Sequence, residues 1–86
     1  MACWRIEFSN EAHKQYRKLP VGYRRNIDTV LKRLTERGPI DIKPVKGKKD
    51  VYRIRVGRYR ILIKAITEDN TYLVFRISTK GGAYKK

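Results

Sequence analysis

The chain has 86 residues, 41% of them hydrophobic, which is enough for one thin domain with a single core, so we expect residues 1–86 to form one domain. A single cysteine, Cys3, and a single histidine, His13, exclude an internal disulfide and argue against a zinc site or a Cys–His catalytic pair. Twenty-two Lys and Arg residues against eight Asp and Glu give a net charge of +14, which opposes compactness and favours nucleic acid as a partner over an acidic protein or an anionic membrane.

The sequence carries no signal for export or membrane insertion. No apolar run approaches the length of a membrane-spanning helix, and the first residues lack the apolar stretch of a signal peptide. We therefore expect the protein to stay in the cytoplasm, without a membrane partner and without a cofactor.

The first predicted element is a half-buried strand near the N-terminus. Its apolar positions, Trp4, Ile6 and Phe8, alternate with polar ones, as is typical of a strand that buries one face. A helix follows, because Ser9 or Asn10 can cap the free N–H groups of a first helical turn.

Two helices are predicted after this strand. The apolar face of the first is formed by Ala12, Tyr16 and Leu19. Pro20 and Gly22 interrupt that pattern. The second helix has the i, i+3, i+4, i+7 spacing at Ile27, Val30, Leu31 and Leu34. Gly38-Pro39 is expected to end it, and most basic residues of both helices read as ordinary solvated faces.

The second half of the chain predicts a loop and a sheet. Residues 40–50 hold one proline, a glycine and four lysines and are expected to be a basic loop. Three strand-like runs follow at residues 51–56, 59–66 and 72–78, and the tail 79–86 is glycine-rich and basic. The predicted fold is therefore α+β: an N-terminal strand, a two-helix hairpin and a three-stranded antiparallel meander, with the helices packed on one face of the sheet.

The most informative segment is the hairpin around Gly57-Arg58. Glycine at the first central position suits a two-residue type II′ turn. The resulting register pairs Val56 with Tyr59, Arg55 with Arg60, Ile54 with Ile61, and Arg53 with Leu62. One face then holds the core residues Tyr52, Ile54, Val56, Tyr59, Ile61 and Ile63. The other face holds Arg53, Arg55, Arg60 and Lys64, with Leu62 among them.

This arginine face predicts a phosphate site. Like charges placed opposite each other on a sheet are destabilising by roughly 0.2–1 kcal/mol per pair; a solvated face could tolerate Arg55 opposite Arg60, but an anionic ligand would give a reason for the three arginines. Guanidinium groups match phosphate oxygens in two-point contact. A merely solvated sheet face remains the alternative interpretation.

The register of the next hairpin depends on its loop. We expect Leu73, Phe75 and Ile77 to join the core, which sends Val74, Arg76 and Ser78 to the arginine side. That arrangement needs an odd loop, and Glu68-Asp69-Asn70 offers a three-residue turn with Asn70 at positive φ. A four-residue loop would invert the register and bury Arg76, which is unfavourable without a partner.

The order strand, two helices, basic loop, then YRIRVGRYR at residues 52–60 and a C-terminal tyrosine resembles the RelE-type toxins of the RelE/ParE toxin–antitoxin superfamily. Ile6-Glu7-Phe8-Ser9 before the first helix and Lys18-Leu19-Pro20 after it also fit the pattern. The resemblance covers nearly the whole chain, and residues 52–60 are its most specific part.

The resemblance implies the toxin of a type II toxin–antitoxin system, acting as a metal-independent endoribonuclease on messenger RNA in the ribosomal A site. In such enzymes the ribose 2′-OH attacks the adjacent phosphate, giving a cyclic phosphate and a free 5′-OH. The implied partners are an acidic, RelB-like antitoxin, the ribosome and messenger RNA. The alternatives are a ParE-like gyrase inhibitor and a non-catalytic nucleic-acid-binding module of the same fold.

The resemblance also implies site residues. The catalytic set is Arg53, Arg55, Arg60, Lys80 and Tyr84. Arg60 would bind phosphate, Tyr84 would hold a base by stacking, and Lys80 is the cation available as leaving-group acid. Arg55 stands where a general-base lysine occurs in relatives, and because arginine stays protonated, the group that takes the 2′ proton is open. The RNA-binding set is Lys46, Lys48, Lys49, Arg58, Lys64 and Arg76.

Overall fold

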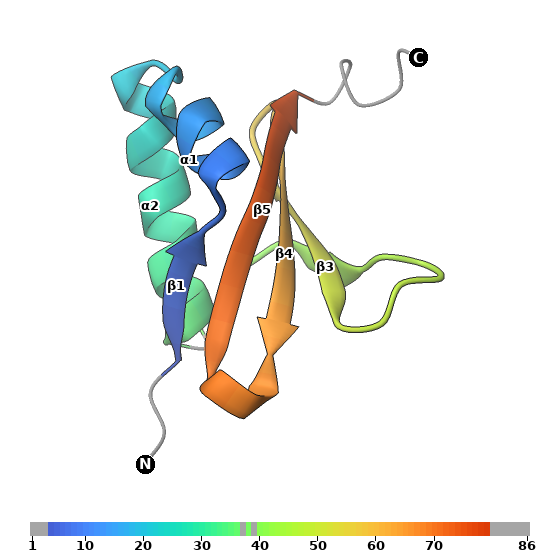
Figure 1. Cartoon of the computed structure of the whole chain (residues 1–86). Coiled ribbons are helices and arrows are strands. Elements are labelled where there is room, and N and C mark those ends of the chain that lie inside the picture. Colours follow the sequence, from blue (N-terminus) through green and yellow to red (C-terminus); the bar gives the residue numbers. More distant parts are fainter. Residues whose placement is uncertain (1–3, 37, 39, 80–86) are drawn as a thin grey trace.

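The computed structural model describes residues 4–36, 38 and 40–79. Its elements are β1 (Arg5–Phe8), α1 (Asn10–Arg17), α2 (Val21–Thr35), β2 (Ile42–Pro44), β3 (Val51–Val56), β4 (Tyr59–Ile66), the 3-10 turn η1 (Thr67–Asp69) and β5 (Thr71–Thr79). The five strands form one sheet in the order β1-β5-β4-β3-β2, and both helices lie on the same side of it (Figure 1). The predicted α+β architecture is confirmed.

The two helices are joined to each other by a side-chain hydrogen bond, and the first is capped at its N-terminus by another. Ser9, rather than Asn10, caps α1, and its Oγ accepts a hydrogen bond from the Ala12 N–H at 3.1 Å. The Tyr16 hydroxyl donates to Asp28 Oδ1 on α2 at 2.7 Å, and this hydrogen bond raises the pKa of Tyr16.

The second helix begins immediately after Pro20 and ends at Thr35, before the Gly38-Pro39 pair that was expected to stop it. The Gly38 N–H donates to the Arg33 carbonyl at 2.7 Å, so the chain turns back over the last helical turn. Neither of the helices in the described residues is long and apolar enough to cross a membrane.

The core lies between the helices and the sheet. Its buried side chains are Ala12, Ile27, Leu31, Leu34, Ile54, Val56, Ile61, Ile63, Val74 and Ile77. The apolar stripe of α2 predicted from its spacing meets alternate residues of β3 and β4 here. Fully burying an aliphatic side chain of this kind contributes about 1.5–3 kcal/mol, so these contacts are the main source of stability.

The central hairpin has the predicted register. Arg55 lies opposite Arg60 and Arg53 opposite Leu62, across the turn at Gly57 and Arg58. Gly57 has φ 59°, and the non-glycine residues with positive φ in the described chain are Asp50 and Asn70. Arg58 therefore has negative φ, which fits the type II′ turn and excludes type I′.

Two strands extend the predicted meander at its edges. Strand β1 pairs in parallel with β5, with Ile6 opposite Tyr72. Strand β2 lies inside the segment 40–50 that was predicted to be loop, so that prediction is wrong for residues 42–44. Ile42 lies opposite Ile54 and packs against the core, and Pro44, opposite Tyr52, is the last residue of the strand.

The β4–β5 connection also differs from prediction. Ile66 pairs with Thr71, so the loop has four residues, 67–70, instead of three, although Asn70 does take a positive φ of 49°. The even loop inverts the register, and a bulge then restores it. Leu62 pairs with Arg76 while Ile63 pairs with Val74, which leaves Phe75 as the extra residue.

The bulge reassigns the side chains on β5. Val74 is completely buried, contrary to the expectation that it would face the arginines, whereas Leu73 and Phe75 are half-buried and not in the core. Beyond the bulge Ile77 is buried, and Arg76 and Ser78 lie on the arginine side as expected.

The bulge can be tested by comparing two truncations on adjacent residues. Val74→Ala should lower the free energy of unfolding by about 2 kcal/mol, because it removes buried methyl groups. Leu73→Ala should cost less than about 1 kcal/mol, since its side chain shares the face of Lys64. Urea unfolding of both variants measures the difference, and a larger loss for Leu73→Ala would contradict the register.

Candidate nucleic-acid interface

The candidate site lies on the open face, which we define as the face of the sheet opposite the helices. The side chains on it form two neighbouring rows that run across the strands. The first row is Arg55, Arg60 and Ser78, and the second is Lys43, Arg53, Leu62 and Arg76. Because paired strands lie about 4.8 Å apart, cations from four strands converge on one small area.

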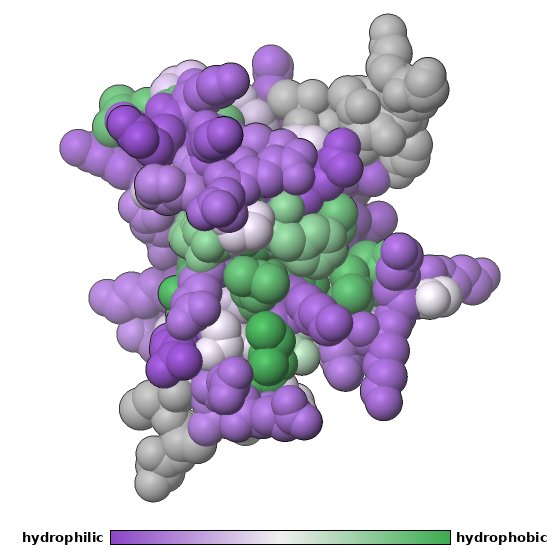
Figure 2. All heavy atoms as spheres, in the orientation of Figure 1, coloured by the Kyte–Doolittle hydropathy of each residue, from purple (hydrophilic) through white to green (hydrophobic). Residues whose placement is uncertain are grey.

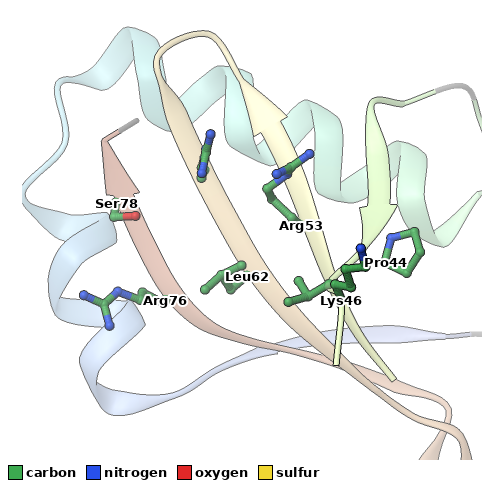
Figure 3. Close-up of a pocket in the computed structure, with 8 residues that line it drawn as sticks. Pro44, Lys46, Arg53, Leu62, Arg76 and Ser78 are labelled. Atoms are coloured by element: carbon green, nitrogen blue, oxygen red, sulfur yellow. The ribbon is translucent and has the colours of Figure 1, made fainter. Parts of the chain in front are cut away.

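Part of this area is hollow. A cavity of about 490 Å³, here called the arginine pocket, opens between the rows. It is lined by Pro44, Val45, Lys46, Arg53, Arg60, Leu62, Arg76 and Ser78. Figure 3 shows Leu62 in the middle, with Arg76 and Ser78 of β5 on one side and Arg53, Pro44 and Lys46 on the other.

Two of the three arginines of the pocket, Arg53 and Arg60, are partly withdrawn from water. The Nε atom of Arg53 is buried and has no hydrogen-bond partner among the residues that the structure describes. The Nε atom of Arg60 is likewise shielded from solvent. A buried donor without a partner costs about 1–3 kcal/mol, so an anion that enters the pocket would recover free energy at Arg53.

The remaining lining of the pocket is suited to a nucleotide. Leu62, Pro44 and Val45 provide apolar surface on which a ribose or base can rest, and Ser78 adds a hydroxyl that can donate or accept. Three guanidinium groups and the Lys46 ammonium group surround this floor. The pocket therefore combines phosphate-binding cations with an apolar surface, and this combination is complementary to a phosphodiester and its sugar.

Arg55 shares the open face but does not line the arginine pocket. Its Nε donates to Asp41 Oδ2 at 3.3 Å, and its side chain is 42% exposed. Of the three arginines predicted for the site, the structure brings Arg53 and Arg60 together with Arg76 and leaves Arg55 at the margin.

The other predicted residues are distributed around the pocket. Lys46 lines it, and Arg58 is exposed at the hairpin turn. Lys49 and Lys64 line a separate shallow hollow at the other end of the sheet, together with Asp50. The remaining site predictions, Lys80 and Tyr84, fall outside the described residues.

A second, apolar hollow adjoins the arginine pocket. It has a volume of about 290 Å³ and is lined by Glu11, Val45, Lys48, Val51, Leu62, Phe75 and Arg76. Val45, Leu62 and Arg76 line both cavities. Figure 2 shows apolar surface gathered near the middle of the view and hydrophilic surface around it.

Sequence reasoning missed several residues of these cavities. Pro44 and Val45 were assigned to a loop, and Phe75 to the core. Asp41 was not considered, because its position opposite Arg55 depends on β2. An alternation of Ile40, Ile42 and Pro44 was the available signal, but three residues are too few to separate a strand from a loop.

Among the described residues, no three His, Cys, Asp or Glu side chains gather in a group that could hold a metal ion. The open face carries guanidinium, ammonium and hydroxyl groups, with the Asp41 carboxylate at its edge.

Comparisons with known proteins cover nearly the whole chain. The model of the family described as "ParE toxin of type II toxin-antitoxin system, parDE" matches residues 6–84. The RelE1 protein of Methanocaldococcus jannaschii, which is named as a toxin, is 31% identical over 88 residues, covering 93% of this chain and 98% of the relative.

Solved structures show the same likeness. A chain of the RelB-RelE antitoxin–toxin complex from Methanococcus jannaschii has a TM-score of 0.76 at 27% identity, covering 91% of this chain and 94% of that one. The isolated E. coli RelE toxin has a TM-score of 0.79 at 25% identity, covering 91% of this chain and 84% of that chain.

An oxyanion should stabilise the protein through the arginine pocket. At equal ionic strength, sulfate should raise the melting temperature above its value in chloride by about 4 °C or more, because a ligand that binds only the folded state stabilises it. Arg53→Gln should reduce this increment, as measured by thermal unfolding.

Arg17→Gln on α1 is the matched control, because it removes the same charge from an exposed position on the helical layer. Arg17→Gln should show the same sulfate-induced rise in melting temperature as the wild type. Because sulfate stabilises folded proteins in general, only the difference between the two variants reports binding in the pocket. Equal increments in both variants would show that the pocket does not bind the anion.

Proposed function

The chain belongs to the RelE/ParE family of toxins from type II toxin–antitoxin systems and is of the RelE type, and we propose that it cuts messenger RNA on the ribosome as a metal-independent endoribonuclease. The observation that supports this activity is the arginine pocket, in which Arg53, Arg60 and Arg76 converge over an apolar floor. Cleavage of translated message would place the protein in the cytoplasm.

The proposed reaction is an internal transesterification. The ribose 2′ oxygen forms a bond to the adjacent phosphorus while the bond from phosphorus to the 5′ oxygen breaks. The 2′ proton passes to a base, and the leaving 5′ oxygen acquires a proton. The products are a 2′,3′-cyclic phosphate and a free 5′-OH, and no oxidant, metal or cofactor is consumed.

The pocket would contribute chiefly electrostatic stabilisation. Negative charge grows on the nonbridging phosphate oxygens as the 2′ oxygen attacks, and guanidinium groups already aimed at that position stabilise it. Arg53 and Arg60 are held by paired strands, so they require little reorganisation. We propose Lys80 as the acid at the 5′ oxygen and Tyr84 as the platform for a base. Arginine cannot act as the base at neutral pH, so none of the pocket arginines takes the 2′ proton.

The proposed antitoxin site is the apolar hollow beside the arginine pocket. A RelB-like antitoxin that carries apolar and acidic side chains would cover Phe75 and Val51 and place carboxylates near Lys48 and Arg76. Solved relatives include RelB-RelE complexes, which supports a partner of this class. Because Leu62 and Arg76 line both cavities, such a partner would exclude RNA from the pocket.

The ParE description of the matching family model favours one alternative, inhibition of DNA gyrase. This activity would not require the three arginines to converge on a cavity. The two functions make opposite predictions for the same set of variants.

Arg60→Ala should abolish messenger cleavage in a translating extract. Loss of a preorganised donor to the developing phosphate charge should lower the rate about 10²–10³-fold. Mapping of messenger 5′ ends by primer extension measures the cuts, which should appear on ribosome-bound message and not on free RNA.

Arg17→Ala on the helical layer serves as the charge-matched control and should cleave like the wild type. Intact message in the wild-type reaction would refute the nuclease, and inhibition of gyrase supercoiling in its place would establish the alternative. Lys46, Lys48, Lys49, Arg58 and Lys64 would be tested in the same assay as guides of the RNA backbone.

Phe75→Ala should weaken antitoxin binding about tenfold while leaving cleavage by the free toxin close to wild type, because Phe75 lines the apolar hollow and not the arginine pocket. The measurement is calorimetric titration with the product of a neighbouring reading frame, where that frame encodes an acidic, RelB-like antitoxin. An unchanged dissociation constant would place the antitoxin elsewhere.

A further inference from the structure

Arg55 and Asp41 are held together by two separate contacts. The Arg55 N–H donates to the Asp41 carbonyl at 3.1 Å, and its guanidinium Nε donates to the Asp41 carboxylate at 3.3 Å. The main-chain contact continues the β2–β3 ladder by one step, so Asp41 lies directly across from Arg55. The ion pair is therefore positioned by the sheet.

This geometry adds a carboxylate to the end of the first row of the open face. Arg55 lies between Asp41 on one side and Arg60 on the other, and Arg60 lines the arginine pocket. Asp41 attracts the Arg55 guanidinium toward the edge of the sheet, whereas Arg60 repels it from the pocket. Both forces keep Arg55 at the margin while the pocket is empty.

The ion pair is weak enough to exchange. The side chains are 42% and 49% exposed for Arg55 and Asp41, and exposed pairs contribute little because water screens them. The contact is made through Nε, so the two terminal amino groups of the guanidinium are not engaged in it. A phosphodiester can bind those groups in a two-point contact that is stronger than the present one.

We propose that Asp41 is a positioning residue that competes with the RNA backbone for Arg55. Without RNA, the carboxylate holds the guanidinium outside the pocket. When one phosphate occupies the pocket, the neighbouring phosphate of the same strand displaces Asp41 and takes over Arg55. This inference rests on the proposed function, since it takes single-stranded RNA as the ligand of the open face, but it concerns binding and does not require cleavage.

The test is a double-mutant cycle of Asp41→Asn and Arg55→Gln. The probe is a fluorescent single-stranded oligonucleotide with 2′-O-methyl riboses, which cannot be cleaved. In the wild-type background, Asp41→Asn should tighten binding roughly threefold, because the neighbouring phosphate no longer has to displace a carboxylate from Arg55. In the Arg55→Gln background, Asp41→Asn should have no such effect.

Two further variants exclude simpler explanations. Glu36→Gln, beside the end of α2, changes the net charge by the same amount and should leave the affinity unchanged, so it controls for overall charge. Asp41→Glu keeps the carboxylate and should restore wild-type affinity. Thermal unfolding of every variant confirms folding, and Asp41→Ser replaces Asp41→Asn if the latter is unstable.

Equal tightening by Asp41→Asn with and without Arg55 would overturn the inference, because it would reflect long-range charge alone. Weaker or unchanged binding in the wild-type background would also overturn it. If the wild type fails to bind the oligonucleotide even at low salt, the proposed RNA-binding face fails as well. If binding follows the cycle while translating extracts show no cuts, only the nuclease is refuted.

Discussion

Arg55 and Arg60 face each other across a two-residue turn, and this placement governs the whole open face. Gly57, with φ 59°, fixes the pairing of β3 with β4. Because side chains alternate along a strand, a slip by one residue would send the arginines into the core and the isoleucines into water. The arginine pocket is thus a consequence of register: once the turn is set, Arg53 can only lie beside Leu62.

The two faces of the same strands have opposite effects on the stability of the domain. On one face Ile54 and Ile61 are fully buried against α2, and the hydrophobic contacts there stabilise the domain. On the other face like charges crowd together, and the Nε of Arg53 is buried without a partner in the described part of the chain. Such crowding lowers stability, so the core must offset it until an anion arrives. In a chain this small, the number of like charges that the open face can carry is limited by the stability that the hydrophobic core provides.

Local signals explain which features the sequence could predict. The glycine turn and the apolar spacing of α2 act over a few neighbouring residues, and both were confirmed. Strand β2 was missed because its alternating pattern is too short to separate a strand from a loop, and its pairing depends on β3. Without β2, the contact between Asp41 and Arg55 could not be predicted either, because the two residues lie 14 positions apart in the chain and meet only through that pairing. The position of Asp41 beside Arg55 is therefore known only from the structure.

The bulge at Phe75 and the four-residue loop before β5 are also non-local in this sense, since the plain alternation of Leu73, Phe75 and Ile77 favours neither. Together they have a consequence for how such chains diverge. An even loop and one extra strand residue cancel: without the bulge Arg76 would turn inward, and without the even loop Val74 would turn outward. Insertions and deletions at the two places must consequently occur as a linked pair, and homologous chains should possess both irregularities or neither.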